Sequence, residues 1–525
     1  MNQTVVKDWE RAARFFAEGQ FEAARRTLQA MLAREPESAE AWLALARVDI
    51  QTGEVRHAAD HALAAANLKP AAPRMLCDIA VALLTIGEVA AARDCLEHAA
   101  AAPPGDAATQ QYLAMQYQNL GDHDAALAWM QRARASGLAD PASRFCMAVQ
   151  LTFHGRMADA EVELEHCATV HPPLGRAMAQ LSQVRKQTPR HNHLALLERQ
   201  LAEVPADSED QAALEFARYK EFEDLGQYED AWRSLRRANE RMHARLRHDS
   251  AAERRTIEAL RGQAAGLPPP RSPRDDGPTP IFIVGLPRSG TTLLDRLLGN
   301  HSEVVSAGEL GTFRRSLERV ADRFTGPMLD QAFAERVSRL DLAEAGTLYL
   351  ANSQWRAKGH RFYTDKLPRN WLLVPLILAA IPGARILHMC REPVAVAFSN
   401  YRSYVGADYP YCYDEDALIS HYAEYRRSMR RWHALAPGAL LDVSYRALVA
   451  DPEAELRKVF DFCGLDWQPG CAELGRNAAP VATLSAMQVR GSIEPGMGER
   501  WRRYESQLAR LREGIAAAVH DIEEP

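Results

Sequence analysis

The chain has 525 residues, of which 47% are hydrophobic and 25% are charged, the balance of an ordinary globular protein. At roughly 100–200 residues per domain, this length predicts two to four domains rather than a single core. The formal charge is −6, because 69 Asp and Glu residues outnumber 63 Lys and Arg residues, and this excludes a generic nucleic-acid binder with its basic excess. Any anion-binding site must therefore be local.

The sequence carries no targeting or redox pattern. Its first residues lack the apolar core of a signal peptide, and no apolar run is long enough to span a bilayer. Eight cysteines are scattered along the chain without a CxxC pair, which indicates neither a disulfide framework nor a zinc site. We therefore expect a cytoplasmic protein with reduced thiols, no transmembrane segment and no metal.

The amino-terminal half repeats one pattern every 34 residues. A glycine opens each repeat's central turn, an alanine follows five residues later, and a proline closes most repeats. These glycines are Gly19, Gly53, Gly87, Gly121 and Gly155, and a displaced copy carries Gly226. The period and residue types resemble tetratricopeptide repeats, in which glycine forms the turn, alanine lets two helices approach and proline ends the second helix. We therefore predict an all-α repeat solenoid over residues 1–262 that binds a protein or peptide partner.

A linker and a phosphate-binding loop follow the repeats. Residues 263–280 contain six prolines and no hydrophobic period, so we predict a linker before a second domain at residues 281–525. The apolar run Ile281–Val284 predicts a buried strand, and the glycine-bounded loop Gly285–Thr292 leads into a helical segment. Strand, loop and helix together form an anion cradle.

The spacing of this cradle is that of a P-loop, but Thr291 stands where the lysine of a nucleoside triphosphatase is expected. No acidic strand end for magnesium is evident either, because the later strand 385–389 leads into Cys390 and Arg391. Both departures weigh against a P-loop kinase-like ATPase, which we keep as an alternative.

Two segments together resemble the donor site of sulfotransferases, which use 3′-phosphoadenosine 5′-phosphosulfate (PAPS). The sequence PRSGTT resembles the family's 5′-phosphosulfate loop, and the strand that ends at Arg391, with Ser399 eight residues on, resembles its 3′-phosphate segment. A guanidinium and a hydroxyl two helical turns apart can face one phosphate. The resemblance implies donor contacts from Pro287, Arg288, Ser289, Gly290, Thr291, Thr292, Arg391 and Ser399.

Three further segments occur in family order. The Asp-Lys pair at Lys366 resembles the segment whose lysine contacts the transferring sulfuryl group, and Tyr445 lies in a segment that resembles the one near the adenosine. The late segment with Ser485 and Arg490 resembles the nucleotide-closing segment of the tyrosylprotein branch. The resemblance implies that Lys366 and Arg288 stabilise the charge that develops during transfer.

The catalytic base must accept a proton from an acceptor hydroxyl. Glu309, in a Ser-Ala-Gly-Glu segment, resembles the glutamate base of the tyrosylprotein-type and related bacterial enzymes. Many cytosolic sulfotransferases use a histidine instead, and His301 is the rival. We interpret His301 as a helix C-terminal residue that interacts with the helix dipole.

Taken together, these patterns predict a repeat solenoid followed by an α/β P-loop sulfotransferase domain with a central parallel sheet. We expect strands at residues 281–284, 361–364, 385–389 and 439–443. The implied reaction moves a sulfuryl group from PAPS to an acceptor hydroxyl without a metal. A peptide tyrosine, a saccharide and a small phenol remain open as acceptors, and a non-catalytic, nucleotide-binding repeat adaptor remains an alternative.

Overall fold

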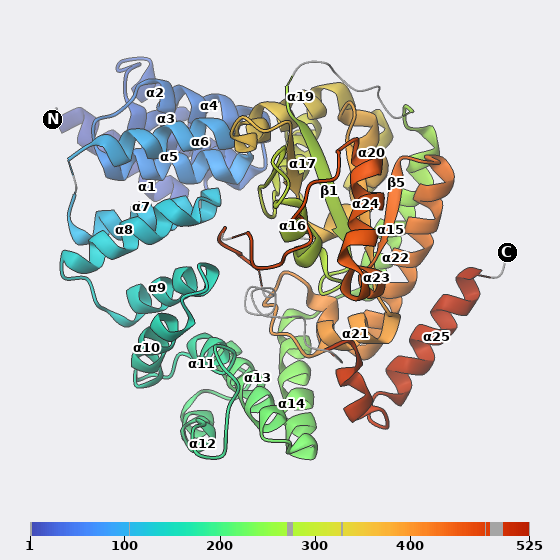
Figure 1. Ribbon diagram of the computed structural model, residues 1–525. Coiled ribbons are helices and arrows are strands. Elements are labelled where there is room, and N and C mark those ends of the chain that lie inside the picture. Colours follow the sequence, from blue (N-terminus) through green and yellow to red (C-terminus); the bar gives the residue numbers. More distant parts are fainter. Residues whose placement is uncertain are drawn as a thin grey trace. The chain divides into compact units, whose positions relative to one another are not determined.

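A computed structural model describes residues 3–103, 105–269, 277–326, 329–477, 479–483 and 497–523 (Figure 1). Its contacts group the chain into two compact units. The first comprises Met1–Leu138, Leu310–Gly326 and Arg339–Arg356, and the second comprises Ala139–Glu309, Pro327–Ser338 and Ala357–Pro525. The packing thus divides the repeats between the two units, whereas the sequence pattern suggested a boundary only at the linker.

The first unit contains four helix pairs in chain order. They are α1 (Gln3–Ala17) with α2 (Phe21–Leu32), α3 (Ala39–Thr52) with α4 (Val55–Asn67), α5 (Pro73–Ile86) with α6 (Val89–Ala101), and α7 (Ala107–Leu120) with α8 (His123–Ala135). The glycine between the helices of each pair has a positive φ, between 72° and 93°, which glycine adopts without strain. The alanines five residues later are fully buried, at 0% exposure: Ala24, Ala58, Ala92 and Ala126. The predicted repeat architecture is confirmed.

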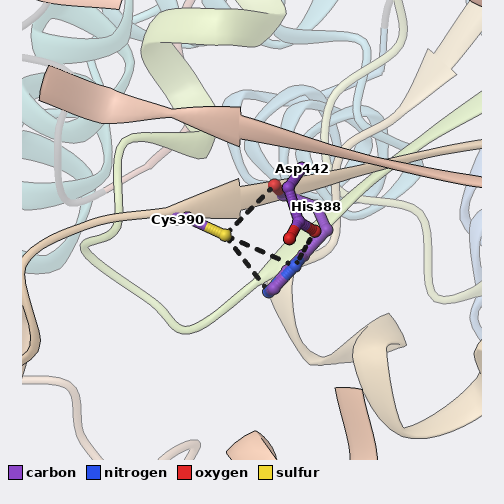
Figure 2. A group of neighbouring side chains, drawn as sticks. All are labelled: His388, Cys390 and Asp442. Carbon is purple, nitrogen blue, oxygen red and sulfur yellow. Dashed lines mark hydrogen bonds and ion pairs between the residues drawn. The ribbon is translucent and has the colours of Figure 1, made fainter. Parts of the chain in front are cut away.

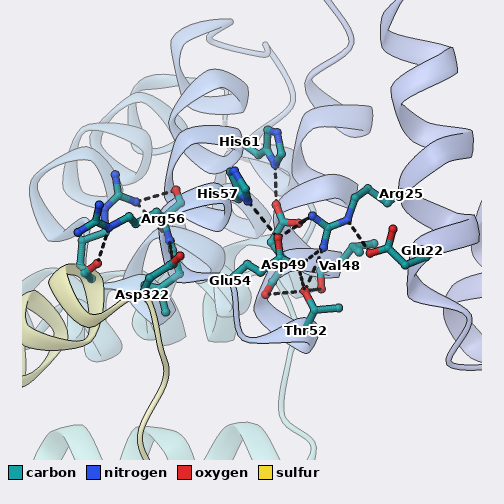
Figure 3. Close-up of polar contacts among 12 residues, drawn as sticks. Glu22, Arg25, Val48, Asp49, Thr52, Glu54, Arg56, His57, His61 and Asp322 are labelled. Atoms are coloured by element: carbon teal, nitrogen blue, oxygen red, sulfur yellow. Dashed lines mark hydrogen bonds and ion pairs between the residues drawn. The ribbon is translucent and has the colours of Figure 1, made fainter. Parts of the chain in front are cut away.

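A polar network ties the first two pairs together (Figure 3). Arg25 contacts Asp49 Oδ1 at 3.1 Å and Glu54 Oε1 at 2.5 Å, and His61 Nδ1 lies 2.6 Å from the buried Asp49 Oδ2. The hydrogen bond from Arg25 holds the pKa of Glu54 at about 2.

Two helices from the second half of the sequence belong to this first unit, α17 (Thr312–Ala321) and α19 (Leu342–Ser353). Helices α4 and α6 begin without a side-chain cap of their own. Asp322 Oδ1 accepts from the Arg56 backbone N–H at 2.8 Å, and Asn352 Oδ1 accepts from that of Ala90 at 3.0 Å (Asp322 in Figure 3). The two segments therefore supply the missing helix caps.

The second unit begins with the remaining repeat helices. These are α9 (Pro141–Phe153), α10 (Met157–Ala168), α11 (Gly175–Leu181), α12 (Leu194–Glu203), α13 (Glu209–Asp224), α14 (Tyr228–Leu246) and α15 (Ser250–Gln263). Gly155 and Gly226 again have positive φ between paired helices, and Ala160 and Ala231 are fully buried. The repeat phase is interrupted at α11 and α12, which lie before the displaced copy that carries Gly226.

A parallel five-stranded sheet forms the core of the second unit. Its strands are β1 (Thr279–Gly285), β2 (Val304–Ser306), β3 (Phe362–Asp365), β4 (Arg385–Cys390) and β5 (Leu440–Ser444), in the order β2-β3-β1-β4-β5. The four predicted strands are all present, and β2 is an additional strand of three residues that the sequence analysis missed. The predicted fold class is confirmed.

The second unit contains further helices besides the repeat helices. They are α16 (Thr291–Leu298), α18 (Gln331–Ala334), α20 (Val374–Ala380), α21 (Pro393–Tyr401), α22 (Glu415–Leu435), α23 (Tyr445–Ala450), α24 (Pro452–Cys463) and α25 (Ala509–Glu523). Short 3-10 turns lie at Ala264–Gly266, Val337–Arg339, Gln354–Ala357, Pro368–Leu373, Pro410–Tyr413 and Met497–Tyr504. Helices α16 and α24 pack on one face through Leu294, Leu297 and Phe460. Across the described ranges, we find no helix with both the length and the apolar character needed to cross a membrane.

Candidate active site

The predicted site residues follow the carboxyl ends of the five strands. Because all strands are parallel, these ends meet at one edge of the sheet, where open α/β sheets bind ligands. In spatial order, the residues are Glu309 after β2, Lys366 after β3, the loop Leu286–Gly290 after β1, Arg391 after β4 and Tyr445 after β5. Residues from five separate sequence segments thus share one edge.

The loop after β1 has the backbone of an anion cradle. Arg288 has a φ of +68°, and Gly290 has a φ of +110° before α16 begins. A Cβ atom on Gly290 would lie 2.4 Å from Cδ2 of Tyr445, so only glycine fits at this position. No side chain caps the first turn of α16, and an uncapped helix N-terminus is suited to an anion.

Hydroxyl groups line the same loop. Ser289 is 2% exposed, and its buried Oγ has no hydrogen-bond partner. Thr291 and Thr292, the first residues of α16, are 4% and 6% exposed. A buried hydroxyl without a partner is costly, and a phosphate oxygen is a suitable acceptor for it. The loop therefore fits the phosphosulfate end of a nucleotide.

Arginines gather at the neighbouring end of β4. Arg391 Nη1 donates to the backbone oxygen of Arg288 at 2.8 Å, and its guanidinium lies 4.5 Å from the centre of the Tyr445 ring. Arg288 Nε donates to Ser399 Oγ at 3.3 Å. The structure thus brings these four predicted donor-binding residues together.

The positive charges of this cluster repel one another. Desolvation, with the nearby charges of Arg402 and Arg391, lowers the pKa of Arg288 to about 10. Burial also lowers the pKa of Arg391, whose Nε is buried without a hydrogen-bond partner. A doubly charged phosphate would stabilise two such guanidinium groups. The cluster is therefore suited to binding anionic groups of a ligand.

Several residues that hold the site residues in place were not identified from the sequence. Asn400 Nδ2 donates to the Pro287 backbone oxygen at 2.9 Å and fixes the loop to α21. Arg402 pairs with the buried Glu223 of α13 at 2.6 Å. Asn400 directly follows Ser399, so its position in the motif could have indicated a role at the site. Glu223 could not be identified in this way, because it lies 179 residues before its partner Arg402.

Glu309 and Lys366 form an ion pair on the other side of the loop. Lys366 Nζ lies 2.5 Å from Glu309 Oε1; the lysine side chain is 1% exposed and the glutamate side chain 38%. The Lys366 backbone N–H donates to the Gly308 backbone oxygen at 2.9 Å. Asp295 of α16 accepts from Ser306 Oγ at 2.5 Å and Thr364 Oγ1 at 2.6 Å. A buried cation is therefore held beside an accessible carboxylate.

His301 lies after α16 and is 2% exposed. Its Nε2 lies 2.9 Å from the Asp466 backbone oxygen, and its Nδ1 accepts from the Glu303 backbone N–H at 3.1 Å. Both ring nitrogens thus have backbone partners. Ser485 and Arg490, expected to close over the nucleotide, lie outside the described residues.

Comparisons with known proteins find a matching family model for a segment in each half of the chain. Residues 280–469 match the model of the sulfotransferase family, and residues 15–75 match that of the tetratricopeptide repeat. The chain thus carries one region that is similar to tetratricopeptide repeats and one that is similar to the sulfotransferase family.

Individual relatives cover different parts of the chain. An "Uncharacterized protein" of Aquifex aeolicus is 30% identical over 393 residues, which span 71% of this chain and 50% of that protein. A putative protein-tyrosine sulfotransferase of Caenorhabditis briggsae is 26% identical over 36% of this chain and 66% of its own length. The sulfotransferase domain of the Synechococcus PCC 7002 olefin synthase is 23% identical, with a TM-score of 0.31, over 47% of this chain and 98% of that domain. The chain thus spans about half the length of the Aquifex protein.

Proposed function

We propose that the protein is a PAPS-dependent sulfotransferase that sulfates an acceptor hydroxyl, and that its repeats recruit the acceptor or a partner protein. The order of residues along the sheet edge carries the proposal. Tyr445 and Arg391 suit the adenosine and 3′-phosphate end, the loop after β1 suits the phosphosulfate, and Glu309 lies beyond it next to Lys366. Nucleotide, transferring group and base thus follow one another across the edge.

The donor supplies a sulfuryl group on a phosphate leaving group. Arg391 and Ser399 hold the 3′-phosphate, while the loop amides with Ser289, Thr291 and Thr292 hold the 5′-phosphosulfate. Tyr445 contacts the adenosine through its ring. The binding residues thereby fix the donor before the chemical step.

Glu309 accepts the proton of the acceptor hydroxyl as its oxygen forms a bond to sulfur and the bond from sulfur to the phosphate oxygen breaks. Lys366 and Arg288 stabilise the negative charge that develops on the bridging and sulfuryl oxygens. The products are the sulfated acceptor and adenosine 3′,5′-bisphosphate. Because Glu309 is 38% exposed on its side chain, an acceptor can reach it from solvent.

Two measurements on the full chain test this proposal. In equilibrium titrations, we expect adenosine 3′,5′-bisphosphate to bind more tightly than ATP with magnesium. Sulfur-labelled PAPS, incubated with the protein and a fractionated cell lysate, is expected to label the peptide, saccharide or small-phenol fraction. Binding without transfer to any fraction would favour a nucleotide-binding adaptor. Magnesium-dependent ATP hydrolysis would favour the kinase-like alternative.

A further inference from the structure

A cluster of histidine, cysteine and aspartate side chains lies on the sheet face opposite α16 and α24. Side chains alternate along a strand, so Met389 joins the core beneath α16, while His388 and Cys390 point to the other face. Asp442 of β5 is the register partner of His388. Figure 2 shows the three side chains converging from two neighbouring strands.

The geometry of the cluster is compact. His388 Nδ1 lies 2.7 Å from Asp442 Oδ1, and Cys390 Sγ lies 3.4 Å from His388 Nδ1. One donor atom from each of the three side chains lies within 4.8 Å of the other two. Tetrahedral zinc, with bonds of about 2.0–2.3 Å, separates its nitrogen, oxygen and sulfur ligands by roughly 3.3–3.6 Å. A small increase in the distance between His388 Nδ1 and Asp442 Oδ1 would therefore let the ion bind between them.

Neighbouring groups orient these side chains as outer partners of metal ligands do. His388 Nε2 is hydrogen-bonded to the Tyr425 hydroxyl of α22, which leaves Nδ1 directed at Cys390 and Asp442. His433 Nε2 lies 2.8 Å from the same Asp442 oxygen. His388 is 2% exposed, whereas the Asp442 side chain is 56% exposed, so the cluster has a buried end and an entry from solvent.

We propose that His388 Nδ1, Cys390 Sγ and the Asp442 carboxylate bind one zinc ion, with solvent as the fourth ligand. Imidazole, thiolate and carboxylate are the ligand types that zinc takes in proteins. On binding, Cys390 releases its thiol proton to solvent, and the two anionic ligands then balance the charge of the dication. As His388 Nδ1 takes the metal, it releases the proton that faces Asp442 to solvent and Nε2 gains one, so that the imidazole stays neutral and Tyr425 turns its hydroxyl to accept from Nε2–H. This site revises the expectation of a metal-free chain and does not depend on the proposed function.

The position of the site gives it a structural role. It joins β4 to β5 directly before Arg391, the residue that follows Cys390, and before Tyr445. A metal here stiffens the strand ends that carry two residues of the candidate active site. We therefore expect zinc to raise the thermal stability of the protein.

Cobalt, which replaces zinc and has a visible spectrum, tests the proposal on the full chain after removal of bound metal with a chelator. We expect one Co²⁺ per chain, a thiolate-to-cobalt charge-transfer band and its loss when zinc is added. Cys390→Ser should abolish the band, while Cys146→Ser, which alters a half-buried cysteine of α9, should leave it unchanged. His433→Ala should weaken cobalt binding about 10–100-fold, the usual effect of removing an outer partner.

Circular dichroism checks that Cys390→Ser has the helix content of the unmodified chain. No charge-transfer band at excess cobalt would mean that the three side chains form only a hydrogen-bonded cluster, and would overturn the proposal. A band that survives Cys390→Ser would overturn it as well. Zinc should raise the melting temperature of the unmodified chain but not that of Cys390→Ser.

Discussion

Arg391 offers a selective test of the nucleotide site, because two natural sulfonucleotides differ only in the group it is proposed to hold. Adenosine 5′-phosphosulfate lacks the 3′-phosphate of PAPS. We expect Arg391→Ala to weaken binding of PAPS strongly and binding of adenosine 5′-phosphosulfate weakly. The ratio of the two losses isolates the contact with the 3′-phosphate.

The magnitude follows from the contacts of Arg391. A hydrogen bond to a charged group contributes about 1.5–3 kcal/mol, which corresponds to roughly 10–150-fold in Kd. Arg391 also donates to the Arg288 backbone oxygen at 2.8 Å and lies over the Tyr445 ring. Its removal therefore disturbs the loop for both ligands, but the direct loss falls only on the 3′-phosphate.

The assay is an equilibrium titration of each ligand at one fixed ionic strength, because salt screens charge interactions. Arg446→Ala is the matched control, since Arg446 is an exposed arginine directly after Tyr445. It should change neither affinity by more than about twofold, the small effect expected of an exposed charge. Equal losses for both ligands on Arg391→Ala would refute the assignment of the 3′-phosphate site.

Three further changes probe other parts of the chain. Thr291→Lys should not create magnesium-dependent ATP hydrolysis. The acidic residue that ends the neighbouring strand β3, Asp365, is fully buried and accepts a hydrogen bond from Asn370 Nδ2 at 3.5 Å, and β4 leads into Arg391. Chelator-sensitive phosphate release would contradict this expectation. Gly290→Ala should lower the free energy of unfolding by about 1–3 kcal/mol in urea titrations and weaken bisphosphate binding, since the new Cβ would meet Tyr445 at 2.4 Å in a left-handed backbone. The pKa of Glu54 is held at about 2 against an ordinary 4.5 by Arg25, so this carboxylate stabilises the fold above about pH 4.5 and its contribution is lost as the pH falls through about 2. The unmodified chain should therefore be more stable than Glu54→Gln at pH 7, with a difference that shrinks over that window; a constant difference would contradict the linkage.

Much of the fold could be predicted because its signals are local. Each turn glycine and the alanine that follows it lie within one repeat. The loop before Thr291 is likewise a single continuous segment, and its glycines indicate its backbone conformation. The three-residue strand β2 was missed because so short a run has no readable alternation. The caps that Asp322 and Asn352 supply to α4 and α6 join positions more than 260 residues apart, and no pattern in the sequence links them.

The same distinction between local and long-range signals applies to the candidate active site and to the proposed zinc site. Arg391 and Ser399 could be paired in the sequence because they lie on consecutive elements eight residues apart. The cluster of His388, Cys390 and Asp442 could not, because the strand register that places Asp442 opposite His388 is a tertiary feature. Counting cysteine spacings finds zinc sites built on one loop but not those built across a sheet.

Glu309 is the residue on which the proposed chemistry depends. Glu309→Gln keeps the size of the side chain and one hydrogen-bonding oxygen for the buried Lys366, but an amide cannot accept the proton of the acceptor. Affinity for the bisphosphate should therefore change little, while transfer should fall by at least about a hundredfold, the lower range of general-base catalysis. Glu303→Gln makes the same chemical change at an exposed ion pair with Arg361 and is the matched control.

The decisive measurement is single-turnover transfer from bound donor to an acceptor identified in the labelling experiment. Lys366→Ala should differ from Glu309→Gln by weakening donor binding as well as transfer, because the lysine acts on the charged group itself. His301→Ala should lower stability but leave the chemical step nearly intact, since both of its ring nitrogens face backbone groups. If Glu309→Gln retains normal transfer while His301→Ala abolishes it, the base is the histidine, and its imidazole must then leave its backbone partners during turnover.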